Sequence, residues 1–365
     1  MKRFKVGVVG CGNISGIYFK NMTGVFSKQL EVVGCADMMP ERTAAVAAQY
    51  PEIKPMEVKA MMADPSIDII VNLTIPKAHF EVSMMAVEAG KHVYAEKPLT
   101  LTREEGRKLL VTAKARNVRV ANAPDTVLGG GHQTCRKLID DGVIGTPVSA
   151  TAFMQCHGHE SWHPDPEFYY QVGGGPMFDM GPYYVTALVN MLGPVARISG
   201  SARVSFPERT ITSEKKRGTK VKVEVPTHIS GVMDFSNGAI GTIITSFDVW
   251  AAGLPCIQIH GSKGSMNVPD PNGFGGEVKV WTPETRDWVT MAHTHPYPDN
   301  SRGIGVADMA ACIEAGVPHS ANGDVAYHVL DIMHAFHDAS ATGRHVLMES
   351  HCVRPPAQPT ASRWL

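Results

Sequence analysis

A repeated unit over the first 120 residues constrains the fold most strongly: each time, a short apolar strand and a turn precede an amphipathic helix. Strands that alternate with helices predict a parallel sheet with helices on both of its faces. The expected strands span residues 4–9, 30–36, 67–74, 92–95 and 118–121, with a weaker one near Ile53, and helices begin near Asn13, Glu41, Lys77 and Arg103. We therefore predict a doubly wound α/β domain over residues 1–123.

The pattern changes near residues 122–128, after which strands mostly follow one another. Asn237-Gly238 separates two alternating runs and predicts a tight hairpin, because this pair accepts positive φ values. Residues 124–365 are therefore expected to form an α+β domain with an open, largely antiparallel sheet. Its expected strands span residues 148–155, 196–206, 220–235, 238–247, 257–260 and 278–281, after a helix at 131–140, and helices at 180–192, 304–315 and 325–342 cover one sheet face.

The composition disfavours several kinds of partner. With 34 Lys and Arg against 35 Asp and Glu, a net charge of −1 offers no basic surface for nucleic acid. No apolar run approaches the ~20 residues of a membrane span. Seven scattered cysteines indicate neither disulfides nor a zinc site, so we expect a cytoplasmic protein.

A charged fraction of 19% is low. We therefore expect a homo-oligomer, whether dimer, tetramer or larger, that covers the open sheet face.

The turn between the first strand and the first helix reads Gly10-Cys11-Gly12-Asn13-Ile14-Ser15. Gly10 permits a tight turn, and Gly12 lets the backbone approach a pyrophosphate at the helix N-terminus, beside Asn13 and Ile14. Ser15 stands where this fingerprint usually has a third glycine, and its small side chain still permits close packing. The sequence therefore predicts a Rossmann-type dinucleotide site.

Asp37 ends the second strand, where a carboxylate can accept hydrogen bonds from both hydroxyls of the adenosine ribose. A 2′-phosphate there would meet a like charge, so NAD is favoured over NADP. Arg42 lies near enough to complicate this preference, and we count it among the cofactor-binding residues. The alternative is that Asp37 serves only as an acid at the start of the next helix.

Further polar residues follow the central strands. Thr74, Pro76 and His79 come after the strand at 67–74, and Asn122 comes after the strand at 118–121. Ligands of doubly wound sheets bind at the carboxyl ends of the strands. We therefore predict that these four residues bind the cofactor.

Glu96 and Lys97 follow the strand at 92–95 and reach the same edge of the sheet. A lysine beside a bound nicotinamide cation is partly desolvated and near like charge, which favours the neutral amine and suits it to proton transfer. The alternative is an ordinary surface lysine, which would not explain its position between apolar residues and Pro98. We predict that both residues bind the cofactor and that Lys97 is also catalytic.

A glycine-rich loop, Gly173-Gly174-Gly175, leads into the helix expected at 180–192. Asp179 and Tyr183 are four residues apart, so we expect them on one face of that helix. Pro182 is tolerated there because the first amides of a helix have no partner within it.

The segment before this loop is rich in histidine and aromatic residues. His157, His159 and His163 with Glu160 suggest a transition metal, but hydride chemistry needs none and the spacing fits no closed site, so we predict no metal. Flat aromatic faces and imidazole donors suit a ligand rich in hydroxyls, so we predict His157, Trp162, His163 and Tyr169 as substrate-binding residues. The alternative is ordinary loop packing.

Together these motifs resemble the glucose-fructose oxidoreductase and inositol dehydrogenase (Gfo/Idh/MocA) family over nearly the whole chain. The resemblance rests on residues 10–15 with Asp37, on 74–79, on Glu96-Lys97-Pro98 after 89–93, and on 173–181. It implies an NAD(P)-dependent dehydrogenase of sugars, cyclitols or glycosides, with Lys97 and Asp179 at catalytic positions.

The chain departs from the family pattern at one catalytic position. The family's usual histidine, four residues after the aspartate, is here Tyr183. Either Tyr183 takes the hydroxyl proton, or Lys97 is the base and Tyr183 orients the sugar. We favour Lys97.

The expected function is the NAD-dependent oxidation of a secondary hydroxyl of a carbohydrate, with C3 of a glycoside as one candidate position. The cofactor supplies the redox chemistry, while the protein places the reacting carbon and a base. Two alternatives stay open: a glycoside hydrolase or lyase that oxidises its substrate transiently, and a non-catalytic protein that senses NAD or a sugar.

Overall fold

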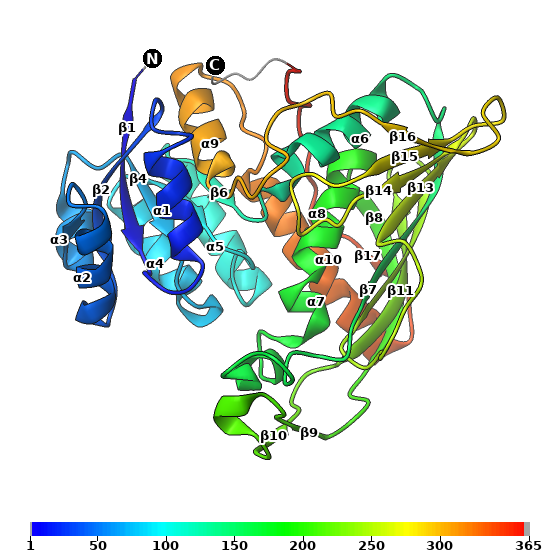
Figure 1. Ribbon diagram of the computed structural model, residues 1–365, viewed down its shortest axis with the longest axis horizontal. Coiled ribbons are helices and arrows are strands. Elements are labelled where there is room, and N and C mark those ends of the chain that lie inside the picture. Colours follow the sequence, from blue (N-terminus) through cyan, green and yellow to red (C-terminus); the bar gives the residue numbers. More distant parts are fainter. Residues whose placement is uncertain (1, 361–365) are drawn as a thin grey trace. The chain divides into compact units, whose positions relative to one another are not determined.

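The computed structural model describes residues 2–360, which form two compact units. The first unit comprises residues 2–129, 295–327 and 355–360, and the second comprises residues 130–294 and 328–354. Each unit has its own sheet. Figure 1 shows the course of the chain and the elements of both units.

The first unit contains a six-stranded sheet in the order β3-β2-β1-β4-β5-β6, and every pair of neighbours is parallel. This confirms the predicted doubly wound α/β architecture. The weak strand expected near Ile53 is the short β3. The strands are β1 (Phe4–Val9), β2 (Leu30–Ala36), β3 (Lys54–Pro55), β4 (Ile69–Asn72), β5 (His92–Ala95) and β6 (Val120–Asn122).

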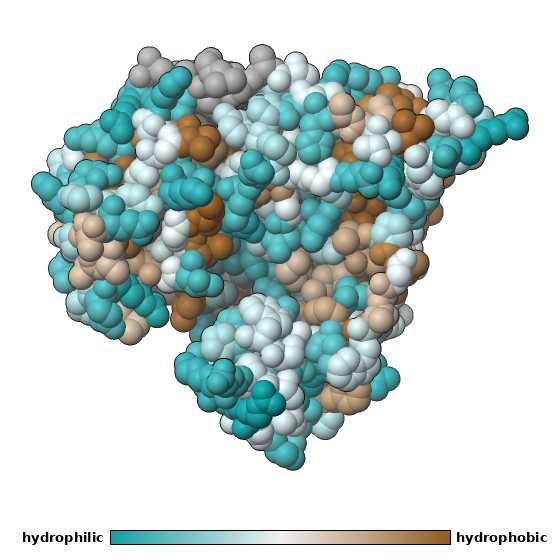
Figure 2. Space-filling model, viewed as in Figure 1, coloured by the Kyte–Doolittle hydropathy of each residue, from teal (hydrophilic) through white to brown (hydrophobic). Residues whose placement is uncertain are grey.

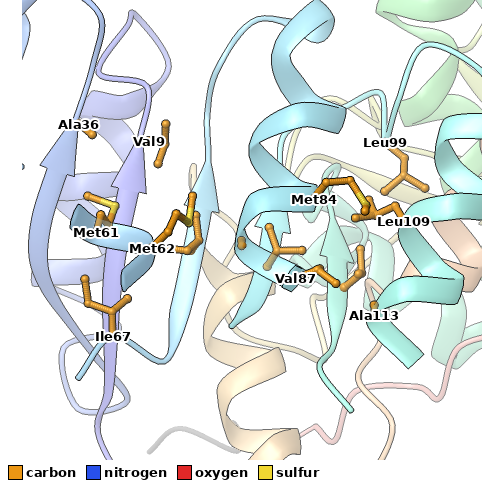
Figure 3. Close-up of a cluster of buried hydrophobic side chains, with 14 residues drawn as sticks. Val9, Ala36, Met61, Met62, Ile67, Met84, Val87, Leu99, Leu109 and Ala113 are labelled. Carbon is orange, nitrogen blue, oxygen red and sulfur yellow. The ribbon is translucent and has the colours of Figure 1, made fainter. Parts of the chain in front are cut away.

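One face of this sheet is buried under three helices. Met61 of α3, Val87 of α4 and Leu109 of α5 pack in one apolar cluster with Val9 at the end of β1 (Figure 3). Because parallel strands are covered by helices, their side chains are mostly apolar. The helices of the unit are α1 (Ser15–Thr23), α2 (Pro40–Gln49), α3 (Val58–Ala63), α4 (Pro76–Glu88), α5 (Arg103–Ala115) and α9 (Ile304–Glu314).

The position of α9 corrects a prediction. We expected a helix at 304–315 on the sheet of the second half, whereas α9 belongs to the first unit and contacts β6. Asp125 Oδ2 accepts hydrogen bonds from the backbone N–H of Gly303 and Gly305, at 2.9 and 3.1 Å. The side-chain amide of Asn21 donates to the carbonyl of Arg302 at 2.8 Å. These long-range contacts, which periodicity does not encode, assign the helix to its sheet.

The second unit contains a nine-stranded open sheet in the order β16-β15-β14-β13-β7-β12-β11-β8-β17. Across the part of the chain that the structure describes, β7 and β12 form its one parallel pair, so the sheet is largely antiparallel as predicted. The strands are β7 (Pro147–Gln155), β8 (Val195–Arg203), β11 (His228–Phe235), β12 (Ile240–Ser246), β13 (Ile257–Gly261), β14 (Ser265–Val268), β15 (Val278–Trp281), β16 (Trp288–Met291) and β17 (Val346–Leu347).

Two local predictions have different outcomes. The Asn237-Gly238 hairpin is confirmed, with Gly238 at φ +92° between β11 and β12. The continuous strand expected over 220–235 is wrong. It is divided into β10 (Lys220–Lys222), which pairs with β9 (Glu208–Thr210) in a separate two-stranded sheet, and β11. Pro226 lies in the break, where it cannot donate a ladder hydrogen bond.

A layer of helices lies along one face of the nine-stranded sheet (Figure 1), and no helix among residues 2–360 covers the other face. They are α6 (Gly130–Asp140), α7 (Gly175–Asp179), α8 (Gly181–Leu192) and α10 (Gly323–Thr342), the last of which begins in residues of the first unit.

The single helix expected to carry Asp179 and Tyr183 is in fact two. Asp179 ends α7, Tyr183 lies in α8, and Met180 separates them. Pro182 lacks the N–H that would continue the α7 ladder.

No helix among residues 2–360 has the length and hydropathy needed to cross a bilayer.

Candidate active site

The glycine turn of the first unit lies between β1 and α1. Gly10 has φ +99°, and a Cβ there would lie 2.6 Å from the carbonyl carbon of Leu73, so both conformation and space require glycine. A Cβ at Gly12 would meet only Arg42 Nη1, at 4.0 Å. The fold itself therefore leaves open space at Gly12, which fits the close approach of a dinucleotide phosphate.

The residues after Gly12 have separate roles in this turn. Asn13 and Ile14 are exposed ahead of the first residue of α1. Ser15 is buried, and its hydroxyl donates to the carbonyl of Gly12 at 2.7 Å. The serine in the third fingerprint position thus ties the turn to the helix.

Asp37 follows β2 and is fixed by two backbone amides. Its Oδ2 accepts from Cys11 N–H at 2.7 Å, and its Oδ1 accepts from Met39 N–H at 2.9 Å. Arg42 Nη1 lies 3.7 Å from Oδ2, and its side chain is 46% exposed. The carboxylate therefore joins the glycine turn to the start of α2, with a cation beside it.

His79 is placed differently from the prediction. It is fully buried, with Nδ1 2.7 Å from the carbonyl of Pro98 and Nε2 3.0 Å from the carbonyl of Thr74. Burial lowers the pKa of this imidazole. His79 has no exposed surface and connects the loops that contain Thr74 and Pro98 inside the protein. Pro76 begins α4, and Thr74 donates its N–H and hydroxyl to Asn72 Oδ1.

The turn that carries Lys97 is held by its neighbours. Glu96 Oε2 accepts from the N–H of Lys97 at 3.1 Å, and Oε1 accepts from the hydroxyl of Tyr18 at 2.8 Å. The side-chain amide of Asn122 donates to the carbonyls of Ala95 and Glu96, at 2.8 and 2.9 Å. Glu96 and Asn122 therefore support the backbone around Lys97. Sequence reasoning missed Tyr18, which is fully buried and whose pKa is raised first by burial and then by the charge of Glu96.

In the second unit, a histidine that we had not assigned a role lies beside Asp179. His159 Nε2 is 3.1 Å from Asp179 Oδ2, and the two side chains are 12% and 17% exposed. The ring of His159 packs edge-on against Tyr169, Phe247 and Trp162. An imidazole and a carboxylate are thus brought together at the end of α7.

The other predicted substrate residues lie in the same segment. Trp162 is 62% exposed, whereas His157 stacks on Trp250 with their ring centroids 3.4 Å apart. His163 Nδ1 accepts from the N–H of Asp165 at 3.0 Å, and burial lowers its pKa. Tyr183 is 7% exposed in the first turn of α8. The segment therefore offers aromatic and imidazole surface.

A hollow of about 430 Å³ adjoins this segment, lined by Trp162, Pro164, Ser213, Glu214 and Lys215. The surface over the neighbouring β9 and β10 is mainly hydrophilic (Figure 2). Lys215 and Lys216 pair with Asp165, at 2.7 and 2.9 Å. The basic residues near 213–222 thus belong to a solvated, ion-paired loop.

Two family models match the chain. One, described as "Oxidoreductase family, NAD-binding Rossmann fold", matches residues 4–123. The other, described as "GFO/IDH/MocA C-terminal domain", matches residues 132–267.

Several known proteins are similar in sequence or in fold. A 1,5-anhydro-D-fructose reductase of Ensifer adhaerens is 27% identical over 241 residues, which cover 65% of this chain and 67% of the relative. A levoglucosan dehydrogenase of Pseudarthrobacter phenanthrenivorans is 24% identical, and the match covers 63% of each chain. These matches thus span about two thirds of each relative. A levoglucosan dehydrogenase structure, in complex with NADH and L-sorbose, superposes with a TM-score of 0.81 at 22% identity, covering 96% of this chain and 100% of that one.

Proposed function

The chain belongs to the Gfo/Idh/MocA oxidoreductase family and carries its NAD-binding Rossmann domain, and from this premise we propose that it oxidises a secondary hydroxyl of a sugar, glycoside or cyclitol. The observation that carries the proposal is the supported turn at the carboxyl end of β5, where Glu96 and Asn122 hold the backbone around Lys97. A lysine at this edge of a dinucleotide-binding sheet is suited to proton transfer beside the nicotinamide.

The first unit provides the residues that would hold NAD. The N-terminus of α1 and the open space at Gly12 suit the pyrophosphate, and Asp37 suits the adenosine ribose. When bound, NAD accepts the hydride from the substrate carbon. Lys97 is the proposed base: it accepts the proton of the substrate hydroxyl as the carbon loses its hydride. The lysine is then a positioned acceptor that needs no water.

The second unit provides the proposed carbohydrate-binding residues. Asp179 accepts a hydrogen bond from the substrate, and the phenol of Tyr183 orients it. The exposed indole of Trp162 offers a flat apolar face for a pyranose ring or an aglycone, while His157, His163 and Tyr169 complete the aromatic segment. The relatives named 1,5-anhydro-D-fructose reductase and levoglucosan dehydrogenase support a carbohydrate substrate. C3 of a glycoside is our proposed position of oxidation.

We propose NAD as the preferred cofactor over NADP. The carboxylate of Asp37 is fixed by two amides and is 8% exposed, so it cannot easily turn away from a 2′-phosphate. Arg42 reduces the repulsion between Asp37 and a 2′-phosphate without removing it, because a nearby guanidinium offsets part of the charge of Asp37.

We further propose that a second copy of this chain covers the open sheet face. Along β11, buried residues alternate with half-buried ones such as Ser230 and Val232, and no helix within residues 2–360 lies over the half-buried side. A low charged fraction of 19% fits a covered surface. Light scattering at micromolar concentration is expected to give at least a dimer, and a monomer would contradict this assignment.

The experiment that tests the function is a substrate panel. Purified protein is incubated with NAD and with sugars, cyclitols and glycosides, while NADH absorbance and the oxo products by mass spectrometry are followed together. We expect equal amounts of NADH and ketone from at least one carbohydrate. A freed aglycone without net NADH would instead identify a hydrolase or lyase, and binding of NAD without any product would identify a sensor.

A further inference from the structure

We infer that His159 is a positioning residue for Asp179, supplying from the segment before the glycine loop an imidazole that α8 lacks. The inference rests on the proposed function, because it assigns a role to a residue that acts through the carboxylate of Asp179. No histidine occurs in α8 (Gly181–Leu192), where the fourth residue after Asp179 is Tyr183. The imidazole beside Asp179 therefore comes from outside α8.

The first support is the contact itself. His159 Nε2 lies 3.1 Å from Asp179 Oδ2, within hydrogen-bond distance, and both side chains are largely shielded from water. A hydrogen bond that involves a carboxylate is stronger than one between neutral groups, and shielding strengthens it further. The ring N–H can thus hold one carboxylate oxygen in a fixed direction.

The second support is the packing around the imidazole. The centroids of Tyr169, Phe247 and Trp162 lie 4.2, 4.7 and 5.2 Å from that of His159, with interplanar angles of 62°, 63° and 71°. Rings that meet edge-on from several directions leave the imidazole little freedom to rotate. Its Nε2 is therefore held toward Asp179 before any substrate binds.

The third support is the guanidinium of Arg209, which contacts the backbone of His157 before His159 and the side chain of Glu160 after it. Nη2 donates to the carbonyl of His157 at 2.9 Å and to that of Phe247 at 3.0 Å. Nε donates to Glu160 Oε1 at 2.7 Å, and Nη1 donates to Asp248 Oδ1 at 2.8 Å. One buried cation thus anchors His157 and Glu160, which flank His159, and also Phe247, the residue after β12.

The role that follows is orientation. By donating to Oδ2, His159 fixes the plane of the Asp179 carboxylate, and no bond at His159 is made or broken during the reaction. A small change in such orientation lowers the rate by ~10- to 100-fold when it displaces a reacting group. The effect is expected in kcat and not in the affinity for NAD.

The test compares variants that separate the ring from its N–H. His159→Phe keeps a flat ring but cannot donate, whereas His159→Gln keeps an N–H donor. We expect kcat to fall ~10- to 100-fold in the Phe variant and clearly less in the Gln variant, with the Kd for NADH within about twofold of wild type in both. His260→Phe is the matched control, because His260 is half-buried and its Nδ1 lies 2.9 Å from a hydroxyl, that of Ser265. Its kcat should be unchanged.

A second arm replaces the side chain with a small molecule. In His159→Ala, imidazole should restore turnover in a saturable way, whereas thiophene, a flat ring without N–H, should not. Equal kcat in the Phe variant and the wild type, or equal rescue by both compounds, would overturn the inference. Circular dichroism and the unfolding temperature show whether His159→Ala folds. If it does not, the comparison of His159→Phe with His159→Gln tests the inference.

A third arm does not depend on activity. The NMR signal of the His159 ring N–H is identified by its absence in His159→Gln. It should shift strongly in Asp179→Asn, while the ring N–H signal of His260 should not. If the His159 ring N–H signal does not shift in Asp179→Asn, the His159–Asp179 hydrogen bond is rejected, even if the protein oxidises sugars. A shift in a protein that oxidises none would instead leave the pair intact and reject the proposed function.

Discussion

His79 Nδ1 lies 2.7 Å from the carbonyl oxygen of Pro98, so a fully buried imidazole fixes the loop that follows Lys97. The other ring nitrogen lies 3.0 Å from the carbonyl of Thr74. The loops after β4 and β5, both at the carboxyl edge of the sheet, are thereby joined beneath the surface.

His79→Phe is predicted to lower both stability and turnover. A buried carbonyl loses the N–H donor of the neutral imidazole, which costs about 1–3 kcal/mol of unfolding free energy, and the Lys97 loop loses its anchor. Urea unfolding and kcat at saturating NAD measure the two effects. His345→Phe, at an exposed position, is the control and should change neither. A His79 variant of wild-type stability would contradict the anchoring role.

Stability is predicted to fall in mild acid because of buried neutral histidines. His328 is fully buried, its Nε2 accepts the N–H of Val195 at 3.0 Å, and burial lowers its pKa to about 4. In the unfolded chain it takes up a proton near pH 6.5, so the unfolded state binds more protons between these values. The stabilisation is present above pH 6.5 and is lost as the pH falls toward 4.

A shift of this size corresponds to roughly 2 kcal/mol at pH 5 for one histidine. Urea unfolding of the wild type and of His328→Gln at pH 7 and pH 5 measures it. The Gln variant, which can still accept from Val195, should lose less stability between the two pH values. The same loss in both proteins would show that His328 is not a source of the pH dependence.

Asp37→Ser is predicted to shift cofactor use toward NADP. Removing the carboxylate removes its repulsion of a 2′-phosphate, and Arg42 then attracts that phosphate without a competing acid. We expect the ratio of kcat/KM for NAD to that for NADP to fall about 10- to 100-fold. Adding Arg42→Ala should reverse part of the gain with NADP. An unchanged ratio would mean that Asp37 does not contact the ribose.

Arg209→Met is predicted to destabilise the second unit strongly. Glu160 and Asp248, each 8% exposed, would lose the cation they share, and a buried charge without its partner typically costs about 3–5 kcal/mol. Arg197→Met is the matched control, because the Arg197–Asp234 pair is substantially exposed and should be worth about 0–1 kcal/mol. Similar losses in the two variants would contradict the burial argument.

The fold of the first unit was largely predictable because its strands are buried on both faces and read as short apolar runs between helices. Prediction of the fold from the sequence fails where segments distant in the sequence pack together. The sequence around Ile304 predicts a helix, but only the contacts of Asp125 and Asn21 assign it to the first unit. Likewise the run at 220–235 has strand periodicity throughout, and Pro226 divides it.

In the candidate site too, local positions were predictable from the sequence, whereas contacts between distant residues were not. The positions of Gly10, Asp37 and Lys97 at one edge of the sheet were predictable because each follows a strand of a parallel sheet. The partners that hold such residues were not. Tyr18 is 78 positions from Glu96, and Arg209 is 49 from Glu160, so no local pattern links them. His159 lay in a segment we had singled out, but its pairing with Asp179 required the structure.

The rate of NADH formation by Lys97→Ala, beside that of Tyr183→Phe, tests the proposed chemistry most directly. Both are measured at saturating NAD with a carbohydrate that the wild type oxidises. If Lys97 is the base, Lys97→Ala should lose about 10²- to 10⁴-fold in kcat, while Tyr183→Phe, which loses only an orienting contact, should lose much less. Normal turnover by Lys97→Ala, with activity abolished in Tyr183→Phe, would contradict the account.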